Sequence, residues 1–154
     1  MRRLDKEIND VKIINEILSK SNICRIALHD DEYPYVVPLN YGYHKNSLYF
    51  HCALKGKKID LIKKNNKVSF VIEQGHEVMK SDISCNWTTK YRSIFGLGAI
   101  EIITDHQKKK EGLDIIMQHH GKNDNTYNKR AVDKVLILKL NIKSMTAKQS
   151  GEWN

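Results

Sequence analysis

The most informative chemistry in the sequence lies where a strand-like run ends and a helix-like run begins. The run Leu48–Ala53 alternates in the manner of a strand and delivers His51, a polar residue, near its end. Gly56 then turns the chain, and Lys57 and Lys58 open a short helical segment. Backbone N–H groups at a helix N-terminus attract anions, and two lysines there add charge-assisted donors. The spacing fits a phosphate site, but taken alone it is more typical of an exposed lysine pair beside a core histidine.

Other clusters of reactive or flexible residues carry weaker signals. Gly96 and Gly98 lack the third glycine of a dinucleotide fingerprint, and their run continues as a strand, so they favour close backbone approach in a curved barrel. His119 and His120 are adjacent, and on a helix they point about 100° apart, so they do not easily chelate one ion. We therefore expect no metal site.

The chain has an odd number of cysteines without a close pair, namely Cys24, Cys52 and Cys85. This pattern favours free thiols in a reducing compartment.

Hydrophobic periodicity gives the elements that must position these residues. Helical spacing predicts three helices, over Asp10–Lys20 with Asp10 as N-cap, Gly56–Lys64 and Asp105–His120. Strand-like runs cover Ile23–Leu28, Tyr33–Tyr43, Leu48–Ala53, Lys67–Glu73, Tyr91–Ile103 and Val135–Ile142. Pro38 cannot donate to a sheet ladder, so its strand is expected at an edge, at a bulge or along a ligand. Five or six mostly antiparallel strands joined by short hairpins predict a barrel.

Length and charge limit the classes of function. The 154 residues suit a single domain, 1–154, and no apolar run approaches the roughly 20 residues that span a bilayer. The basic N-terminus is not followed by the apolar core of a signal peptide, so we expect a cytoplasmic protein without a membrane partner. The net charge is +8, but 21 lysines against 5 arginines are scattered along the chain, which is typical of a solvated surface. We therefore expect no nucleic-acid partner.

Several blocks of sequence, in order, resemble the flavin-binding split-barrel superfamily. They are Ile23–Leu28, Pro34–Tyr43, Leu48–Ala53 with Gly56–Lys58, Trp87–Ile94, Gly96–Gly98 and Val135–Ile142 with Met145–Lys148. Within that superfamily the chain is similar to the nitroimidazole-resistance (Nim) proteins, which are relatives of pyridoxamine 5′-phosphate oxidase. The resemblance implies a mainly β protein of the α+β class: an antiparallel, FMN-binding split β-barrel with peripheral helices.

The resemblance also implies a homodimer with FMN at the subunit interface. It places one segment beside the isoalloxazine ring: Val37, Pro38, Leu39 and Asn40. It places a second segment at the ribityl and phosphate end: Phe50, His51, Cys52 and Ala53. Lys57 and Lys58 match the oxidase's basic pair, and Gly56 stands where the oxidase usually carries a serine. Trp87 and Arg92 are expected to reach the flavin of the other subunit.

The implied activity is that of an FMN-dependent oxidoreductase, with reduction of a 5-nitroimidazole antibiotic as the associated reaction. Val37, Leu39 and Trp87 would give the ring its apolar wall. His51 is the candidate catalytic residue, and three roles stay open for it: phosphate donor, substrate-facing acid or core residue. The alternative is a non-catalytic flavin- or haem-binding protein, a sensor or store, in which His119 or His120 would serve as the haem ligand.

Overall fold

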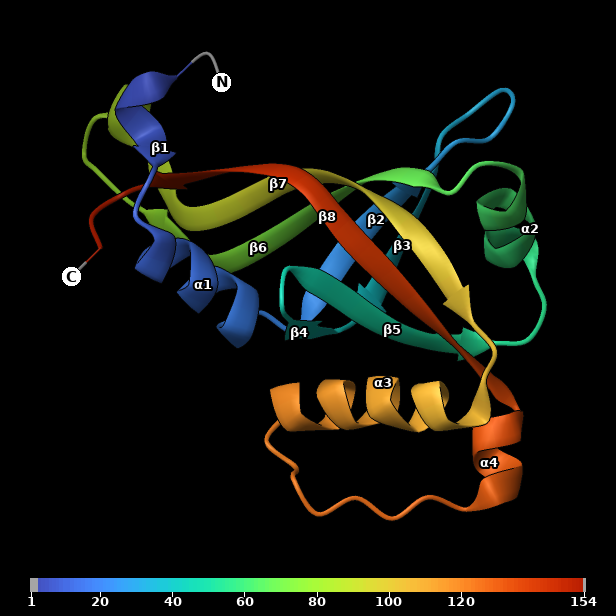
Figure 1. Ribbon diagram of the computed structural model, residues 1–154. Coiled ribbons are helices and arrows are strands. Elements are labelled where there is room, and N and C mark those ends of the chain that lie inside the picture. The colour runs from blue at the N-terminus through green and yellow to red at the C-terminus, as the bar shows by residue number, and fades with distance from the viewer. Residues whose placement is uncertain (1–2, 154) are drawn as a thin grey trace.

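The structure is a computed structural model that describes residues 3–153, and within these residues eight strands form one antiparallel sheet (Figure 1). The strands are β1 (Glu7–Ile8), β2 (Ile23–Leu28), β3 (Tyr35–Asn40), β4 (Gly42–His44), β5 (Ser47–Ala53), β6 (Lys67–Met79), β7 (Thr88–Ile103) and β8 (Val135–Ser150). Their order is β3-β2-β6-β7-β8-β5-β4, with β1 paired to β8. Because Tyr41 alone joins β3 to β4, the two ends of this order meet, and the sheet curls into the expected antiparallel split barrel.

The core fills the inside of this barrel. Alternate residues of β2 point inward, namely Cys24, Ile26 and Leu28, and Phe70 of β6 lies among them. Tyr41 is fully buried, and its hydroxyl donates a hydrogen bond to the Leu18 carbonyl at 2.8 Å. The sequence predicted one strand over Tyr33–Tyr43; burial of Tyr41 interrupts it, which separates β4 from β3.

Gly96 and Gly98 allow β7 to pass close to its neighbours, as the sequence predicted. A Cβ on Gly96 would overlap the ring of Phe70, and one on Gly98 would lie 2.5 Å from the Asn141 carbonyl oxygen. The register of β7 against β8 also shifts between Leu97 and Gly98. The two glycines therefore serve the curvature of the sheet.

Four α-helices lie around the barrel within the described residues: α1 (Val11–Lys20), α2 (Lys57–Lys64), α3 (His106–His119) and α4 (Lys129–Asp133). Short 3₁₀ turns cover Leu4–Lys6 and Ser84–Asn86. The side chain of Asp10 caps α1 by accepting from the Lys12 N–H, so the predicted cap is confirmed. In residues 3–153 we find no helix with the length and apolarity needed to cross a bilayer.

Helix α3 lies across the strands β4, β5 and β8 (Figure 1). It buries Ile116 in a small second apolar cluster with Ile103 and Ile137. Its backbone passes so close to β4 that a Cβ on Gly42 would lie 2.7 Å from the Ile115 carbonyl oxygen. The sequence predicted α3 but missed α4, which has only five residues.

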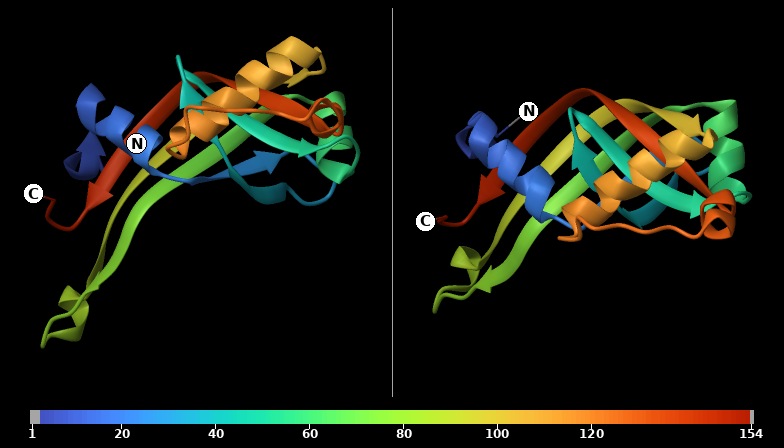
Figure 2. Two further views of the ribbon diagram at one scale, coloured as in Figure 1. Left: turned by 90° about the horizontal axis from the view of Figure 1, so that it is seen from below. Right: turned by 60° about the horizontal axis from the view of Figure 1, so that its bottom comes forward.

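Strands β6 and β7 continue beyond the barrel as a hairpin arm that projects from the rest of the chain (Figure 2). The predicted ends at Glu73 and Tyr91 are therefore wrong, since the strands run to Met79 and from Thr88. The β6–β7 register shifts between Gln74 and Glu77, around Gly75 at φ +66°. The arm is exposed on both faces, which removes the hydrophobic alternation that predicts a half-buried strand.

Candidate functional site

The start of α2 is the clearest anion-binding feature of the chain. Gly56 is its N-cap with φ +135°, no side chain in the described residues caps this end, and a Cβ there would meet open space. The N–H groups of Ile59 and Asp60 bond back to the Gly56 carbonyl, which leaves the two amides before them for a ligand. These amides belong to Lys57 and Lys58. Peptide dipoles and free amides thus meet at one helix end, and the two residues that carry these amides are lysines.

Lys57 is held from the opposite side by the β2–β3 connection. Its Nζ lies 2.6 Å from Oδ2 of Asp30 and 5.3 Å from the ring centroid of Tyr35 on β3. Hydrogen bonding to Lys57 lowers the pKa of the Asp30 carboxyl, and the same contact raises the pKa of Lys57. Both groups are therefore charged at neutral pH.

Lys58 lies beside the end of β5 and is half-buried. Its charge acts on the thiol of Cys52, but burial has the larger effect and raises the pKa of Cys52. Cys52 is consequently a neutral, unreactive thiol. The start of β3, the end of β5 and the start of α2 therefore meet at one end of the barrel, as the phosphate hypothesis requires.

The two faces of β5 separate the residues predicted for the ribityl and phosphate end. Phe50 and Cys52 point into the core, whereas His51 and Ala53 are exposed on the other face. His51 is paired with Ile137 of β8, which lies under α3. A core role for His51 is therefore wrong, and the roles of phosphate donor and substrate-facing acid stay open.

Strand β3 forms one end of the strand order, so the edge position predicted from Pro38 is confirmed. Val37 and Leu39 are half-buried on the inner face, whereas Pro38 and Asn40 are exposed on the outer face. Arg25 is the residue opposite Pro38 on β2. The predicted ring-binding segment thus presents two different surfaces, and the apolar side chains of its inner face contribute to the barrel.

An apolar groove crosses the outer face of the sheet. Two adjoining hollows of about 460 and 750 Å³ share Ala27 and Ser69 in their walls. Their apolar lining includes Val36, Val71, Phe95 and Leu97. Pro34 lines both the larger hollow and a third one, of about 340 Å³, that includes Lys57. The groove therefore reaches the β2–β3 connection and the start of α2.

Sequence reasoning did not single out the large apolar side chains that line this groove. An ion pair between Arg25 and Glu73, 2.5 Å apart, lies in its wall. A signal was available in the residues that point outward from each strand. Such solvent-facing positions are usually polar, but here they include the apolar residues Val36, Phe95 and Leu97.

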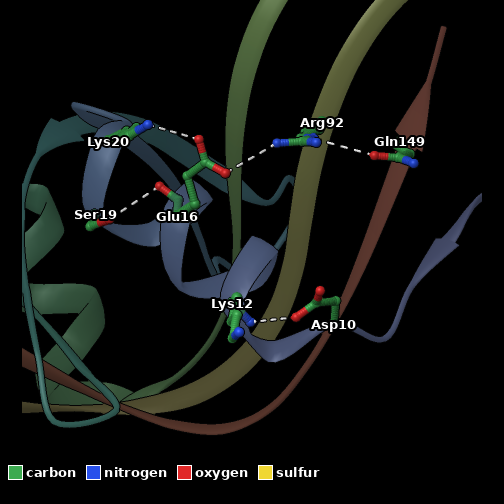
Figure 3. Close-up of polar contacts among 7 residues, drawn as sticks. All are labelled: Asp10, Lys12, Glu16, Ser19, Lys20, Arg92 and Gln149. Carbon is green, nitrogen blue, oxygen red and sulfur yellow. Dashed lines mark hydrogen bonds and ion pairs between the residues drawn. The ribbon is translucent and has the colours of Figure 1, made fainter. Parts of the chain in front are cut away.

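Arg92 is used inside its own chain (Figure 3). Its guanidinium donates to Glu16 of α1 at 3.4 Å and to Gln149 of β8 at 3.3 Å, and it stacks 4.2 Å from the ring centroid of Trp153. The side chain is only 9% exposed. All of these contacts lie within one chain, and the expectation that Arg92 reaches a flavin on another subunit stays a prediction. Trp87 lies near the tip of the hairpin arm and is 51% exposed, so its role stays a prediction.

His119 is not free to ligate haem, contrary to the expectation from the sequence. Its Nδ1 accepts from the Tyr43 N–H at 3.3 Å, and its Nε2 lies 2.8 Å from the Ser21 carbonyl oxygen, which makes Nε2–H the donor. His120 is exposed beside it. Residues 3–153 contain no group of three His, Cys, Asp or Glu side chains placed to hold a metal ion.

Comparison with known proteins relates the chain to one family. The family model described as pyridoxamine 5′-phosphate oxidase matches residues 10–149. A candidate 5-nitroimidazole antibiotic resistance protein of Bacteroides thetaiotaomicron is 33% identical over 93% of this chain and 86% of its own, with a TM-score of 0.83.

Two further matches are more limited. A protein of Mycobacterium smegmatis described as binding FAD and haem shares the fold at a TM-score of 0.85 and 19% identity, over 96% of this chain and 75% of its own. An uncharacterised protein of Rhizobium meliloti is 34% identical over 58 residues, which is 38% of each chain. The two solved structures share the split-barrel architecture described above.

Proposed function

Because the chain belongs to the pyridoxamine 5′-phosphate oxidase family, we propose that it binds FMN and acts as a flavin-dependent oxidoreductase. The observation that supports this best is the uncapped start of α2, where Lys57 lines a hollow that adjoins the apolar groove and Lys58 follows it in the helix. FMN combines a planar ring system with an anionic phosphate tail, so it needs an apolar groove beside an anion-binding site.

The donor set fits the phosphate of such a cofactor. The free amides at the start of α2 and the Lys57 and Lys58 ammonium groups would hold it, and no carboxylate caps that helix end. The apolar wall of Val36, Phe95 and Leu97 would shield the ring from water. The bound flavin would supply the electron transfer, while the protein supplies binding and orientation.

We propose a nitroaromatic compound of the 5-nitroimidazole class as substrate. The support is the 33% identity with a candidate 5-nitroimidazole resistance protein, over most of both chains. The test is loss of the nitro absorbance when the purified, flavin-loaded protein receives a chemical reductant and a 5-nitroimidazole. A flavin-loaded protein that does not accelerate this loss over free FMN would refute the drug-reductase activity and leave flavin binding standing.

The absorbance spectrum of the purified protein tests the cofactor itself. Two flavin bands are expected, and a single Soret band would instead show haem.

For the phosphate site, replacing both Lys57 and Lys58 by Ala removes two charge-assisted hydrogen bonds, each worth about 1.5–3 kcal/mol. FMN affinity should fall by about two to four orders of magnitude, while riboflavin, which has no phosphate, should bind both proteins alike.

We also propose a homodimer that covers the outer face of the sheet. Val36, Phe95 and Leu97 on this face are 57%, 49% and 42% exposed, which is unusual for large apolar side chains gathered together. Light scattering should give twice the mass of the chain, and Phe95→Glu should shift it toward the monomer. Val11→Glu is the matched control, since Val11 is an exposed apolar residue on α1.

A cytoplasmic location is part of the same proposal. Cys24 and Cys52 are buried free thiols, and Cys85 is an exposed one, which suits a reducing compartment. Fractionation of cells that express the tagged protein tests this, and recovery in a secreted or membrane fraction would contradict it.

A further inference from the structure

We propose that Asp30 sets the affinity of the α2 anion site by competing with the bound phosphate for Lys57. This inference rests on the proposed flavin function, and it assigns a regulating role to a residue outside the helix that would bind the phosphate.

The geometry makes Asp30 the fixed member of the pair. One carboxylate oxygen accepts from Lys57 at 2.6 Å, and the other accepts from the Asp31 backbone N–H at 3.0 Å. The Asp30 side chain is 21% exposed against 59% for Lys57. A lysine ammonium on a four-carbon stem has many rotamers, so Lys57 is the partner that can turn toward a ligand.

The contacts of Lys57 point away from an unsatisfied helix end. Its ammonium is attracted by the Asp30 carboxylate and lies near the ring face of Tyr35, both outside α2. The free amides at the start of α2 would hold a phosphate by themselves. A phosphate bound there attracts the same ammonium, so the carboxylate and the phosphate are alternatives for one positive charge.

Lys58 differs from Lys57 in this respect. Among residues 3–153 we find no carboxylate within ion-pair distance of Lys58, and its side chain lies beside Cys52. Lys58 can therefore act on a phosphate without first leaving an acidic partner. Lys57 and Lys58 should therefore contribute unequally to phosphate binding, because Asp30 of the β2–β3 connection pairs with only one of them.

The size of the effect follows from the exposure of the pair. Ion pairs at the surface change equilibria by about 1.5- to fivefold. Asp30→Asn, which keeps the shape of the side chain and removes its charge, should therefore tighten FMN binding by about that factor.

The experiment is a flavin titration by fluorescence quenching, with FMN and riboflavin as probes. The variants are Asp30→Asn, Lys57→Ala and the double variant, with Asp31→Asn as matched control because it removes the same charge from the same loop. We expect tightening of FMN binding by Asp30→Asn beyond that by Asp31→Asn, and no change for riboflavin. In the Lys57→Ala background the effect of Asp30→Asn should shrink to that of Asp31→Asn.

The possible results separate the two proposals. The role of Asp30 is overturned if Asp30→Asn weakens FMN binding, leaves it unchanged, or tightens it only as much as Asp31→Asn does. Each of these results leaves the flavin proposal standing. A tightening that persists without Lys57 also overturns it, because competition for that lysine would not be the cause. A wild-type protein that binds neither flavin overturns both proposals.

Discussion

His119 connects three elements of the fold, and replacing it should be costly. Its ring accepts from the Tyr43 N–H of β4 and donates to the Ser21 carbonyl at the end of α1, while the residue itself belongs to α3. It also lies 4.8 Å from the ring centroid of Tyr41. His119→Ala leaves two part-buried backbone groups without a partner, at about 1–3 kcal/mol each. We expect a loss of roughly 2–6 kcal/mol in the free energy of unfolding.

The same residue makes stability depend on pH. Burial lowers the pKa of His119 below its usual 6.5, so the ring stays neutral in the folded chain. Below about pH 6.5 the unfolded chain takes up a proton that the folded chain resists. The contribution of His119 is therefore complete above the unfolded pKa, and it is lost as the pH falls through the folded pKa.

The groups around His119 support this direction. His120 packs edge-on against it with ring centroids 5.3 Å apart, and its charge further lowers the pKa of His119, while the hydrogen bond to Ser21 raises it. Tyr41 and Tyr43 face the ring from the strand side, and the pKa of Tyr41 is raised by burial, so its phenol stays neutral.

The assay is chemical unfolding at about pH 7.5 and about pH 5.5. The variants are His119→Ala, His119→Phe, which keeps a ring, and His120→Ala, which is exposed and should cost less than about 0.5 kcal/mol. The wild type should lose more stability between the two pH values than His119→Phe does. Equal losses, or a His119→Ala protein as stable as His120→Ala, would refute the reasoning.

Three further outcomes follow from the packing and from the thiols. Gly96→Ala should cost about 1–3 kcal/mol in unfolding free energy, because the new methyl group would overlap the buried Phe70 ring; a thermal melt like that of the wild type would contradict this. Arg92→Met keeps the packed stem but removes both polar contacts, and it should lower the melting temperature by several degrees, about 1–2 kcal/mol. A thiol reagent should modify the exposed Cys85 quickly in the folded chain and Cys24 and Cys52 slowly, because burial raises the pKa of these two thiols. Fast reaction of all three thiols would count against the fold.

Features encoded by near neighbours in the sequence were predicted well. The Asp10 cap, the helix that opens after Gly56 and the edge position of Pro38 each depend on a few adjacent residues. The resemblance to the family, carried by blocks in the right order, gave the split barrel, which the comparisons confirm.

Features that depend on distant pairing could not be predicted in this way. The ends of β6 and β7 are set by mutual pairing in an exposed arm, where apolar alternation disappears. Arg92 meets Glu16 across 76 positions of the chain, and His119 meets Ser21 across 98, so no local pattern announces either contact. The intrachain contacts of Arg92 were missed because Glu16 and Gln149 lie far from it in the sequence.

The site at α2 shows the same limit at the level of chemistry. The motif Gly56-Lys57-Lys58 indicates an anion site from the sequence, and the structure leaves that helix start uncapped. What the motif does not contain is Asp30, 27 positions before Lys57 and 2.6 Å from it. A local motif specifies how many positive charges stand at a site, whereas the fold determines how many of them are already paired. The affinity for a phosphate depends on how many of these charges are already paired, so it must be measured on the folded protein and cannot be inferred from the number of lysines.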